Sequence, residues 1–254
     1  MTMNGNNPVN ISTRDKRLLE NAFPNKNELE NAVTRVINGE PLQYVLGKWE
    51  FMSLDFIVSP SVLIPRSDTE TLAEAALNLL PQNGGKVLDI CTGSGCILIS
   101  LLHYSKQSSG IGIDINTSAL NTASENAILN NVQEKATFIH CDALQPLLFD
   151  ADSFDIIVSN PPYIRTEILT SLDPSVINYE PHLALDGGLD GLTFYKAIAK
   201  NAKNLLKPGG TLLFEIGFDQ RDAVLNIMQN CGYSSINCKK DLTGNDRVVT
   251  GVNS

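Results

Sequence analysis

Short apolar runs alternate with helical patterns through most of this chain, and that alternation is the feature that most constrains its fold. The run at residues 86–91 is followed by a helical pattern at 94–104, and the run at 110–115 by one at 117–130. Near-continuous apolar strands joined by helices are typical of a parallel sheet covered on both faces. The last two runs, joined by a short turn at residues 243–246, predict an antiparallel ending. The sequence therefore predicts an α/β protein with a Rossmann-like, seven-stranded, mostly parallel sheet.

Three regions can be distinguished along the chain. Residues 1–40 carry two short helical patterns, preceded by about ten polar, asparagine-rich residues that we expect to be disordered. Residues 41–66 contain two alternating apolar runs and predict a hairpin linker. Residues 67–254 hold the α/β domain, whose first helix opens with Ser67 and Glu70 at the spacing of a capping box.

Charge and cysteine content limit the classes of function. The chain of 254 residues has a net charge of −9, which argues against high non-specific affinity for a nucleic-acid backbone, because such binding needs clustered Lys and Arg. Its five cysteines and three histidines lack metal-ligand spacing, so we expect reduced thiols and no metal site. Since no apolar run reaches membrane-spanning length and no signal pattern is present, we expect no membrane association and a cytoplasmic location.

A glycine turn connects the first apolar run to the next helix, and it consists of Cys91, Thr92, Gly93, Ser94 and Gly95. Glycines permit close backbone approach, and the amino end of a helix favours polar groups. Alone, such a turn is weak evidence, because it also occurs in dinucleotide-binding proteins and as a plain connection. The third glycine of the GxGxxG pattern is missing here, which disfavours a nicotinamide dinucleotide.

Three acidic residues lie at the ends of predicted strands, where open α/β sheets bind ligands. Asp89 is placed to accept a hydrogen bond from an ammonium group of a ligand. Asp114 is placed to accept hydrogen bonds from ribose hydroxyls, and its alternative role is to begin the following helix. Asp142 is placed to meet an adenine amino group, or it is an ordinary loop acid.

The string Asn160-Pro161-Pro162-Tyr163 ends the apolar run at residues 154–159. Two prolines cannot donate ladder hydrogen bonds, so the strand must stop there. The Asn160 side-chain oxygen and the Pro161 carbonyl can accept the two hydrogens of a planar –NH2 group, while Tyr163 packs over it. A plain turn is the alternative, because Asn-Pro commonly opens one. Together with the glycine turn, this string predicts an S-adenosylmethionine-dependent enzyme that methylates a planar nitrogen.

Further blocks follow one another from about residue 38 to the end: GEPLQYVLG, VLIPRSDTE, VLDICTGSG, FDIIVSNPPYI, NYEPHLALDGGLDGLTFY, LKPGGTLLFEIG and DLTGNDRVV. In this order they resemble the blocks of the HemK/PrmC family, the protein-glutamine N-methyltransferases that modify peptide-chain release factors. NPPY alone is shared with amino-methyltransferases of DNA and RNA. The joint presence of the IPR block and the EPHLALDGGLDGL block is much more specific.

The resemblance implies a seven-stranded S-adenosylmethionine-dependent methyltransferase sheet with a small helical N-terminal region. It implies methyl transfer to the side-chain amide of a glutamine in the Gly-Gly-Gln loop of a release factor. In that reaction Asn160 and Pro161 would receive the amide and act as catalytic residues together with Tyr163, and Pro162 and Tyr163 would shape the slot.

The same resemblance implies S-adenosyl-L-methionine as the cofactor, bound by the turn at residues 91–95. Asp114 would lie on the ribose, and Asp142 with Ala143 would border the adenine. We also expect Asn160 to contact the cofactor. The family usually has glycine where Cys91 stands, and its helical N-terminal region is longer.

Two alternatives remain open at the level of sequence. A DNA or RNA amino-methyltransferase uses the same NPPY string, but a DNA enzyme would want a basic recognition domain, which this acidic sequence lacks. A catalytically silent, cofactor-binding module is the other alternative, and the intact NPPY string disfavours it.

Overall fold

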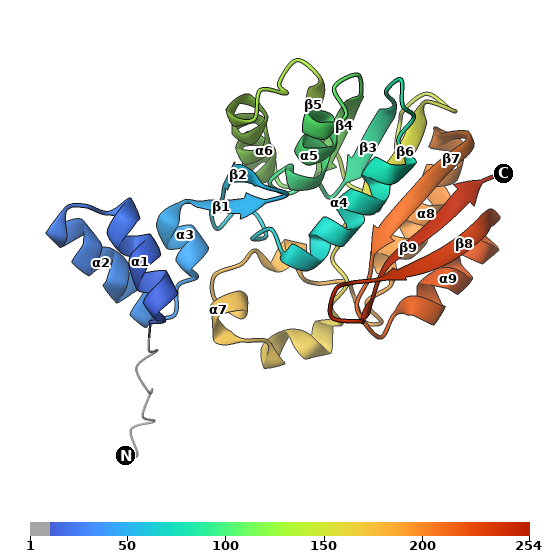
Figure 1. Cartoon of the computed structure of the whole chain (residues 1–254). Coiled ribbons are helices and arrows are strands. Elements are labelled where there is room, and N and C mark those ends of the chain that lie inside the picture. Colours follow the sequence, from blue (N-terminus) through green and yellow to red (C-terminus); the bar gives the residue numbers. More distant parts are fainter. Residues whose placement is uncertain (1–10) are drawn as a thin grey trace.

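The computed structural model describes residues 11–254, so the expected disorder of the first ten residues lies outside the described range. A small helical part at the N-terminal end is followed by a two-stranded hairpin and by a seven-stranded sheet (Figure 1). The first two parts contain α1 (Thr13–Ala22), α2 (Lys26–Ile37), α3 (Leu42–Leu46), β1 (Lys48–Phe51) and β2 (Leu54–Ile57).

The large sheet has the strand order β5-β4-β3-β6-β7-β9-β8. Its strands are β3 (Lys86–Ile90), β4 (Ser109–Asp114), β5 (Ala136–His140), β6 (Phe154–Ser159), β7 (Leu206–Glu215), β8 (Tyr233–Lys240) and β9 (Asp246–Asn253). The strands from β3 to β7 pair in parallel, whereas β9 pairs antiparallel with both β7 and β8. The predicted seven-stranded, mostly parallel sheet with an antiparallel ending is therefore confirmed.

Helices cover both faces of this sheet (Figure 1). They are α4 (Ser67–Leu79), α5 (Cys96–Tyr104), α6 (Thr117–Leu129), α8 (Thr193–Leu205) and α9 (Arg221–Asn230). The long loop after β6 contains α7 (Pro174–Ile177) and the short 3₁₀ helices η1 (Thr166–Ser171) and η2 (His182–Ala184). None of the helices between residues 11 and 254 is long and apolar enough to cross a membrane.

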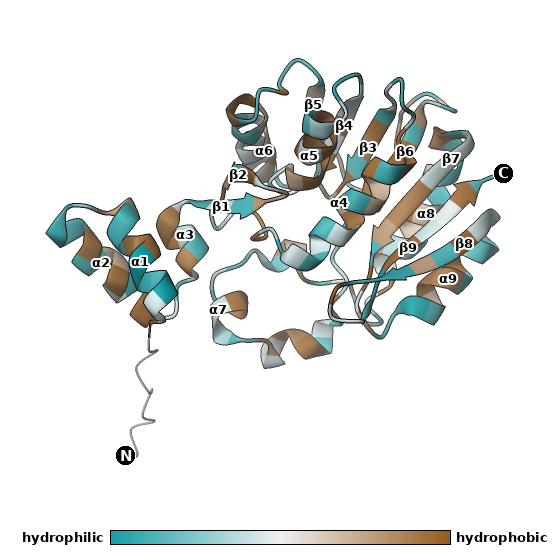
Figure 2. Cartoon of the chain, in the orientation of Figure 1, coloured by the Kyte–Doolittle hydropathy of each residue, from teal (hydrophilic) through white to brown (hydrophobic). Residues whose placement is uncertain are grey.

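Successive residues of each strand point to opposite faces and build two cores. On β3, Val87 packs with α4, α5 and α6, whereas Leu88 packs with α8 and α9 on the other face. The strands β6 and β7 are correspondingly mostly apolar in the middle of the sheet, as the hydropathy colouring shows (Figure 2). A separate, smaller core holds the N-terminal helices together around Leu19, Ala32 and Val45.

The chain reverses its direction of travel across the sheet between β3 and β6. These two strands pair in parallel, with Ile90 opposite Ser159, and Ser159 Oγ donates a hydrogen bond to the Ile90 carbonyl. The segments that follow both strands therefore leave the sheet side by side. Open α/β sheets bind their ligands at such a switch point, outside the carboxyl ends of the strands.

The predicted capping box at the start of α4 is wrong. Arg66, not Ser67, occupies the cap position, and its side chain makes no capping hydrogen bond. Glu70 instead accepts a hydrogen bond from the Met52 backbone N–H at 2.7 Å. The carboxylate thus ties the hairpin to α4 rather than closing the first turn of its own helix.

Asn126 joins three segments that are distant in sequence. This side chain on α6 is fully buried, and its Nδ2 donates to the carbonyls of Ile57 and Ser94 at 3.0 and 2.9 Å. Its Oδ1 accepts from the Ile57 N–H. One amide therefore pairs the free edge of the hairpin and the glycine turn with the same helix.

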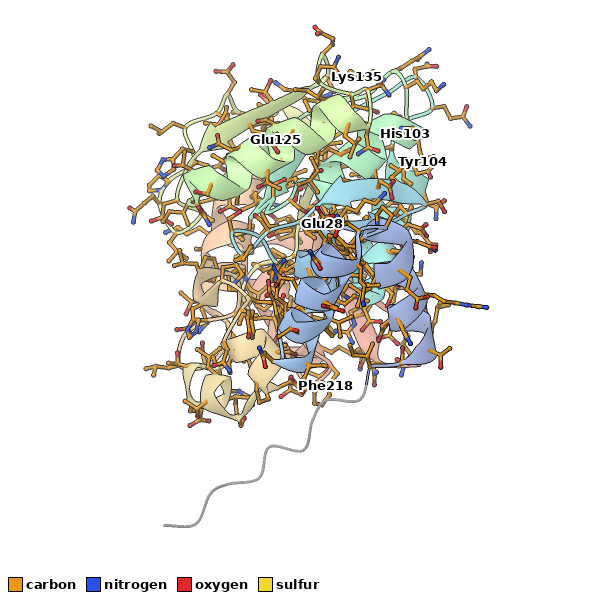
Figure 3. All side chains as sticks on the ribbon, turned by 90° about the vertical axis from the view of Figure 1, so that its left-hand side faces the viewer. Glu28, His103, Tyr104, Glu125, Lys135 and Phe218 are labelled. Carbon is orange, nitrogen blue, oxygen red and sulfur yellow. The ribbon has the colours of Figure 1, made fainter. Side chains whose placement is uncertain are left out.

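We expect Asn126→Ala to lower the free energy of unfolding by about 3 kcal/mol, because each buried backbone group left unpaired costs roughly 1–3 kcal/mol. Urea denaturation measures the change. Glu125→Ala is the matched control, since this exposed side chain lies on the same helix (Figure 3). Equal stability of the two variants would contradict the role assigned to Asn126.

Candidate active site

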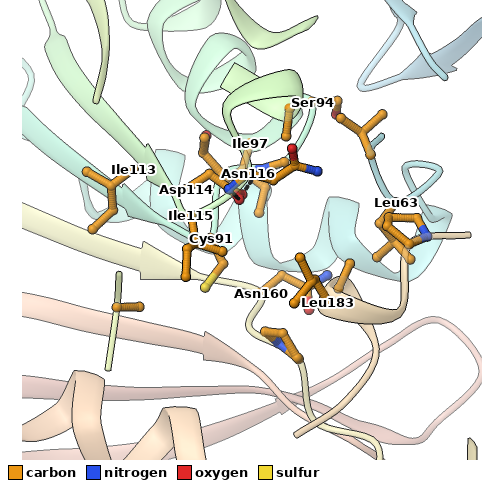
Figure 4. Close-up of a pocket in the computed structure, with 18 of the residues that line it drawn as sticks. Leu63, Cys91, Ser94, Ile97, Ile113, Asp114, Ile115, Asn116, Asn160 and Leu183 are labelled. Carbon is orange, nitrogen blue, oxygen red and sulfur yellow. Dashed lines mark hydrogen bonds between the residues drawn. The ribbon is translucent and has the colours of Figure 1, made fainter. Parts of the chain in front are cut away.

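A pocket lies at the carboxyl ends of the central strands, where the switch point places it (Figure 4). Its walls come from the turns after β3, β4, β5 and β6, from residues 61–66 before α4, and from residues 181–184 in the loop that contains η2. Most residues expected to bind a cofactor or substrate line this one pocket: Cys91, Thr92, Gly93, Ser94, Asp114, Asp142, Ala143, Asn160 and Pro162. The remaining ones, Asp89, Gly95, Pro161 and Tyr163, belong to the glycine turn, the strand end before it or the NPPY string but are not among the residues that line the pocket.

The two glycines of the turn serve different purposes. Gly93 has a φ of +54°, and a Cβ built there meets nothing within 4 Å, so the turn leaves open space beside the pocket. At Gly95, with a φ of +77°, a Cβ would lie 2.9 Å from Ile99 Cδ1 and 3.1 Å from Ala123 Cβ. Gly95 is therefore required for the close packing of α5 against α6.

Cys91 adopts a backbone conformation that favours glycine. Its φ is +63°, in the left-handed region that few residues other than glycine occupy. Burial raises the pKa of its thiol well above the usual range, nearby Asp114 and Asp89 raise it further, and a hydrogen bond with Ser159 opposes the rise. The thiol is therefore protonated and unreactive near neutral pH.

Asp114 organises the glycine turn from the neighbouring strand. Its Oδ2 accepts from the Gly93 N–H and its Oδ1 from the Asn116 N–H, both at 2.9 Å. Asn116 itself caps α6 by accepting from the Ser118 N–H. The carboxylate thus shapes the turn and precedes a helix start, and it also lines the pocket.

The other two strand-end acids differ in their exposure to the pocket. Asp142 lines it together with Ala143, and its Oδ1 accepts from the Leu144 N–H at 2.9 Å. Asp89 is fully buried, and its Oδ2 accepts from Thr92 Oγ1 at 2.7 Å. Burial raises the pKa of Asp89 to about 7, and its Oδ1 has no partner within the described part of the chain. Asp89 therefore supports the turn from behind.

The NPPY string leaves β6 beside the glycine turn. Asn160 is half-buried, and its Nδ2 donates to Thr69 Oγ1 on α4 at 3.3 Å. Tyr163 is held by its backbone, since its carbonyl accepts from Gln220 Nε2 at 3.0 Å. Gly187 packs so closely on Tyr163 that a Cβ there would lie 2.7 Å from the Tyr163 Cα. The long loop after the string therefore folds back on it.

One wall of the pocket depends on a contact between two segments that are distant in the sequence. Glu180, which is buried in the loop after NPPY, forms an ion pair with Arg66 and accepts from the Ile64 N–H at 3.3 Å. This contact ties the loop to the segment before α4. Exposed apolar side chains also line the pocket, namely Ile115, Leu144 and Leu183. Ile115 directly follows Asp114. An apolar residue immediately after the end of a predicted strand was the sequence signal that could have indicated its place in the pocket.

Metal chemistry has no candidate ligand set here. Between residues 11 and 254, no group of three or more His, Cys, Asp or Glu side chains could hold a metal ion.

Comparison with known proteins places this site in a class. A family model described as "Methyltransferase domain" matches residues 81–248. A methyltransferase structure from Pyrococcus furiosus has the same fold, with a TM-score of 0.60 and 17% identity over 89% of this chain and 99% of that one. The chain is a methyltransferase by fold and domain.

Closer relatives define the family. A release factor glutamine methyltransferase from Agrobacterium fabrum is 44% identical over 86% of this chain and 76% of its own length. Another from Clostridium acetobutylicum is 43% identical over 84% of this chain and 75% of its own length. The chain therefore belongs to the release factor glutamine methyltransferase family.

The conformation of Cys91 predicts how substitutions there behave. Cys91→Gly should change the free energy of unfolding by less than about 1 kcal/mol, because relief of the left-handed backbone offsets the loss of thiol packing. Cys91→Val should lower it by more than about 1 kcal/mol, since a β-branched residue is strained at positive φ. Urea denaturation compares them, and equal destabilisation by both variants would contradict this account.

Proposed function

We propose that this chain transfers a methyl group from S-adenosylmethionine to the side-chain amide nitrogen of a glutamine in a peptide-chain release factor. The observation that carries the proposal is the position of Asn160, which opens into the same pocket as the glycine turn because β3 and β6 are paired. The family of the chain supports the choice of substrate. The Gly-Gly-Gln loop of the release factor is the expected target.

The lining of the pocket fits this cofactor. The open space at Gly93 accommodates a polar chain, and the carboxylate of Asp114 faces the same pocket as a hydrogen-bond acceptor for ribose hydroxyls. The exposed apolar side chains of Ile115, Leu144 and Leu183 provide surfaces for a flat purine ring, with Asp142 and Ala143 at its edge. When bound, the cofactor supplies an electrophilic methyl group on sulfur.

The protein's part in the reaction is orientation. An amide nitrogen is a poor nucleophile because its lone pair is conjugated with the carbonyl. Asn160 Oδ1 and the Pro161 carbonyl accept the two N–H hydrogens and turn the lone pair toward the methyl group. The new N–CH3 bond would replace the S–CH3 bond, and one of the two N–H protons would then leave to give the neutral methylamide. Tyr163 packs against the flat amide and excludes water; burial raises the pKa of its hydroxyl to about 12, so it stays neutral. Positioning of this kind accounts for much of enzymatic rate enhancement.

The regions outside the α/β domain have a proposed role in docking. We divide the chain into the helical region 1–40, the hairpin linker 41–66 and the methyltransferase domain 67–254. The helical region packs around its own small core, and Tyr179 Oη reaches from the loop after NPPY to the Asn38 carbonyl at 3.3 Å. A partner that contacts the helical region would therefore lie next to the entrance of the pocket.

If Asn160 accepts a substrate N–H, Asn160→Ala should lower kcat on a release factor by about 10²–10³, the usual cost of losing one preorganised hydrogen-bonding group. Cofactor affinity should change little. Asn226→Ala, an exposed position on α9, is the matched control. Near-normal turnover of the Asn160 variant would mean that the NPPY string is only a turn. Methylation of duplex DNA at a rate comparable with that of a release factor would favour the nucleic-acid alternative.

Asp114→Ala should weaken binding of S-adenosylmethionine by roughly tenfold or more, because a charge-assisted hydrogen bond contributes about 1.5–3 kcal/mol. The loss of the bond to the Gly93 N–H also loosens the turn. Calorimetry measures the affinity, with the exposed Asp222→Ala on α9 as the control. An unchanged affinity would place the ribose elsewhere.

A further inference from the structure

Glu215 is a buried carboxyl group that the mechanism above does not use. It ends β7 and is 2% exposed. Because Ser159 of β6 lies opposite Phe214 of β7, Glu215 follows on the strand beside Asn160. Among the described residues, its Oε2 has no hydrogen-bond partner. A buried carboxyl oxygen without a partner is costly, and such groups are retained mainly where they serve a function.

Two side chains connect this carboxyl group to the pocket. Thr69 and Asn160 both approach it and favour its charged form. Asn160 Nδ2 also donates to Thr69 Oγ1 at 3.3 Å, which leaves the hydroxyl hydrogen of Thr69 free to point at Glu215. Asn160 lines the pocket (Figure 4), so these contacts link the buried carboxyl group at the end of β7 to the pocket.

The chemistry of these groups fixes the orientation of Asn160. A carboxylate only accepts hydrogen bonds, whereas a carboxamide has one donating and one accepting end. With Glu215 ionised, Nδ2 of Asn160 must face Glu215 and Thr69, so Oδ1 turns toward the pocket. The opposite orientation would present Nδ2 to the hydrogens of an incoming –NH2 group, donor against donor.

We propose that Glu215 is a positioning residue whose carboxylate holds Asn160 Oδ1 toward the methyl acceptor and so makes the pocket selective for an –NH2 group. The role in turnover rests on the proposed function, whereas the orientation of Asn160 does not.

The protonation state of Glu215 should then be visible in the enzyme. Burial raises the pKa of Glu215 to about 7, and Asp68 adds to the rise, while Thr69, Arg247 and Asn160 oppose it. Protonated Glu215 can donate to Asn160 Oδ1, which removes the preference for one orientation. Turnover should therefore fall as the pH falls through about 7.

The other ionisable groups that face Glu215 come from α4, α5, α8, β9 and the segment after β6: Asp68, Cys96, Tyr195, Arg247 and Tyr163. Burial raises the pKa of Cys96 and Tyr163 to about 12 and that of Tyr195 well above its usual range, so these groups stay neutral near pH 7. Arg247 stays charged and pairs with Asp68 and Asp241. Asp89, beyond Cys96, has a pKa near that of Glu215, so variants must be compared to separate the two.

A measurement on the free protein tests the orientation without any substrate. In ¹⁵N-labelled protein, the side-chain amide signals of Asn160, assigned by their loss in Asn160→Asp, should shift with a midpoint near pH 7. That transition should be absent in Glu215→Gln. A transition that persists unchanged in Glu215→Gln would overturn the proposal.

Turnover provides the second test. Glu215→Gln should lower kcat on a release factor about tenfold or more, with little change in KM or in cofactor affinity, because a glutamine supports both amide orientations. The acidic limb of the pH profile due to Glu215 should disappear. Asp68→Asn is the control: it removes a neighbouring, partly exposed charge, and kcat should stay within about twofold.

The other possible outcomes also support or overturn the proposal. Wild-type kcat with an unchanged acidic limb in Glu215→Gln would overturn the proposal. If that variant fails to fold, Thr69→Val takes its place: a lowered kcat that Thr69→Ser restores supports the proposal, and an unchanged kcat overturns it. If the wild-type protein does not methylate a release factor at all, the proposed function fails, and the titration of Asn160 still tests the orientation.

Discussion

The parallel pairing of β3 with β6 is the constraint on which the rest of the site depends. It sets Ile90 opposite Ser159, and the bond from Ser159 Oγ to the Ile90 carbonyl closes the pair at its carboxyl end. The glycine turn and the NPPY string leave the sheet next to each other because of this pairing, although about seventy residues separate them in the sequence. The other residues of the pocket are arranged around these two segments.

The site concentrates features that cost stability. Cys91 holds a left-handed backbone, and Asp89 and Glu215 each keep a buried carboxyl oxygen without a partner in the described chain. For both acids, burial raises the pKa to about 7. Folding therefore favours the protonated forms of both acids. Their contribution to the free energy of unfolding is fully present below the pKa that these carboxyl groups have in the unfolded chain. It is lost as the pH rises through their folded pKa of about 7. Proteins tolerate such costs where function requires the geometry.

The sequence predicted the fold and most of the pocket because both depend on local signals. Apolar periodicity defined the strands, and the residues at the strand ends, from Cys91 to Asn160, follow from topology once the sheet is parallel. The pairing of Glu180 with Arg66 and the contact of Glu215 with Thr69 could not be fixed from the sequence, since they join segments whose distance only the folded chain sets. The capping box at Ser67 failed for the same reason: Glu70 found a tertiary partner in the hairpin.

The central claim is that the pocket delivers a methyl group to a planar amide nitrogen. Its most direct test is tandem mass spectrometry of a release factor after incubation with this protein and isotopically labelled S-adenosylmethionine. The account predicts one added methyl group, located on the side-chain nitrogen of the glutamine in the Gly-Gly-Gln loop. Labelling of a carboxylate, a lysine or a backbone position, or no labelling by a protein that binds the cofactor, would contradict it.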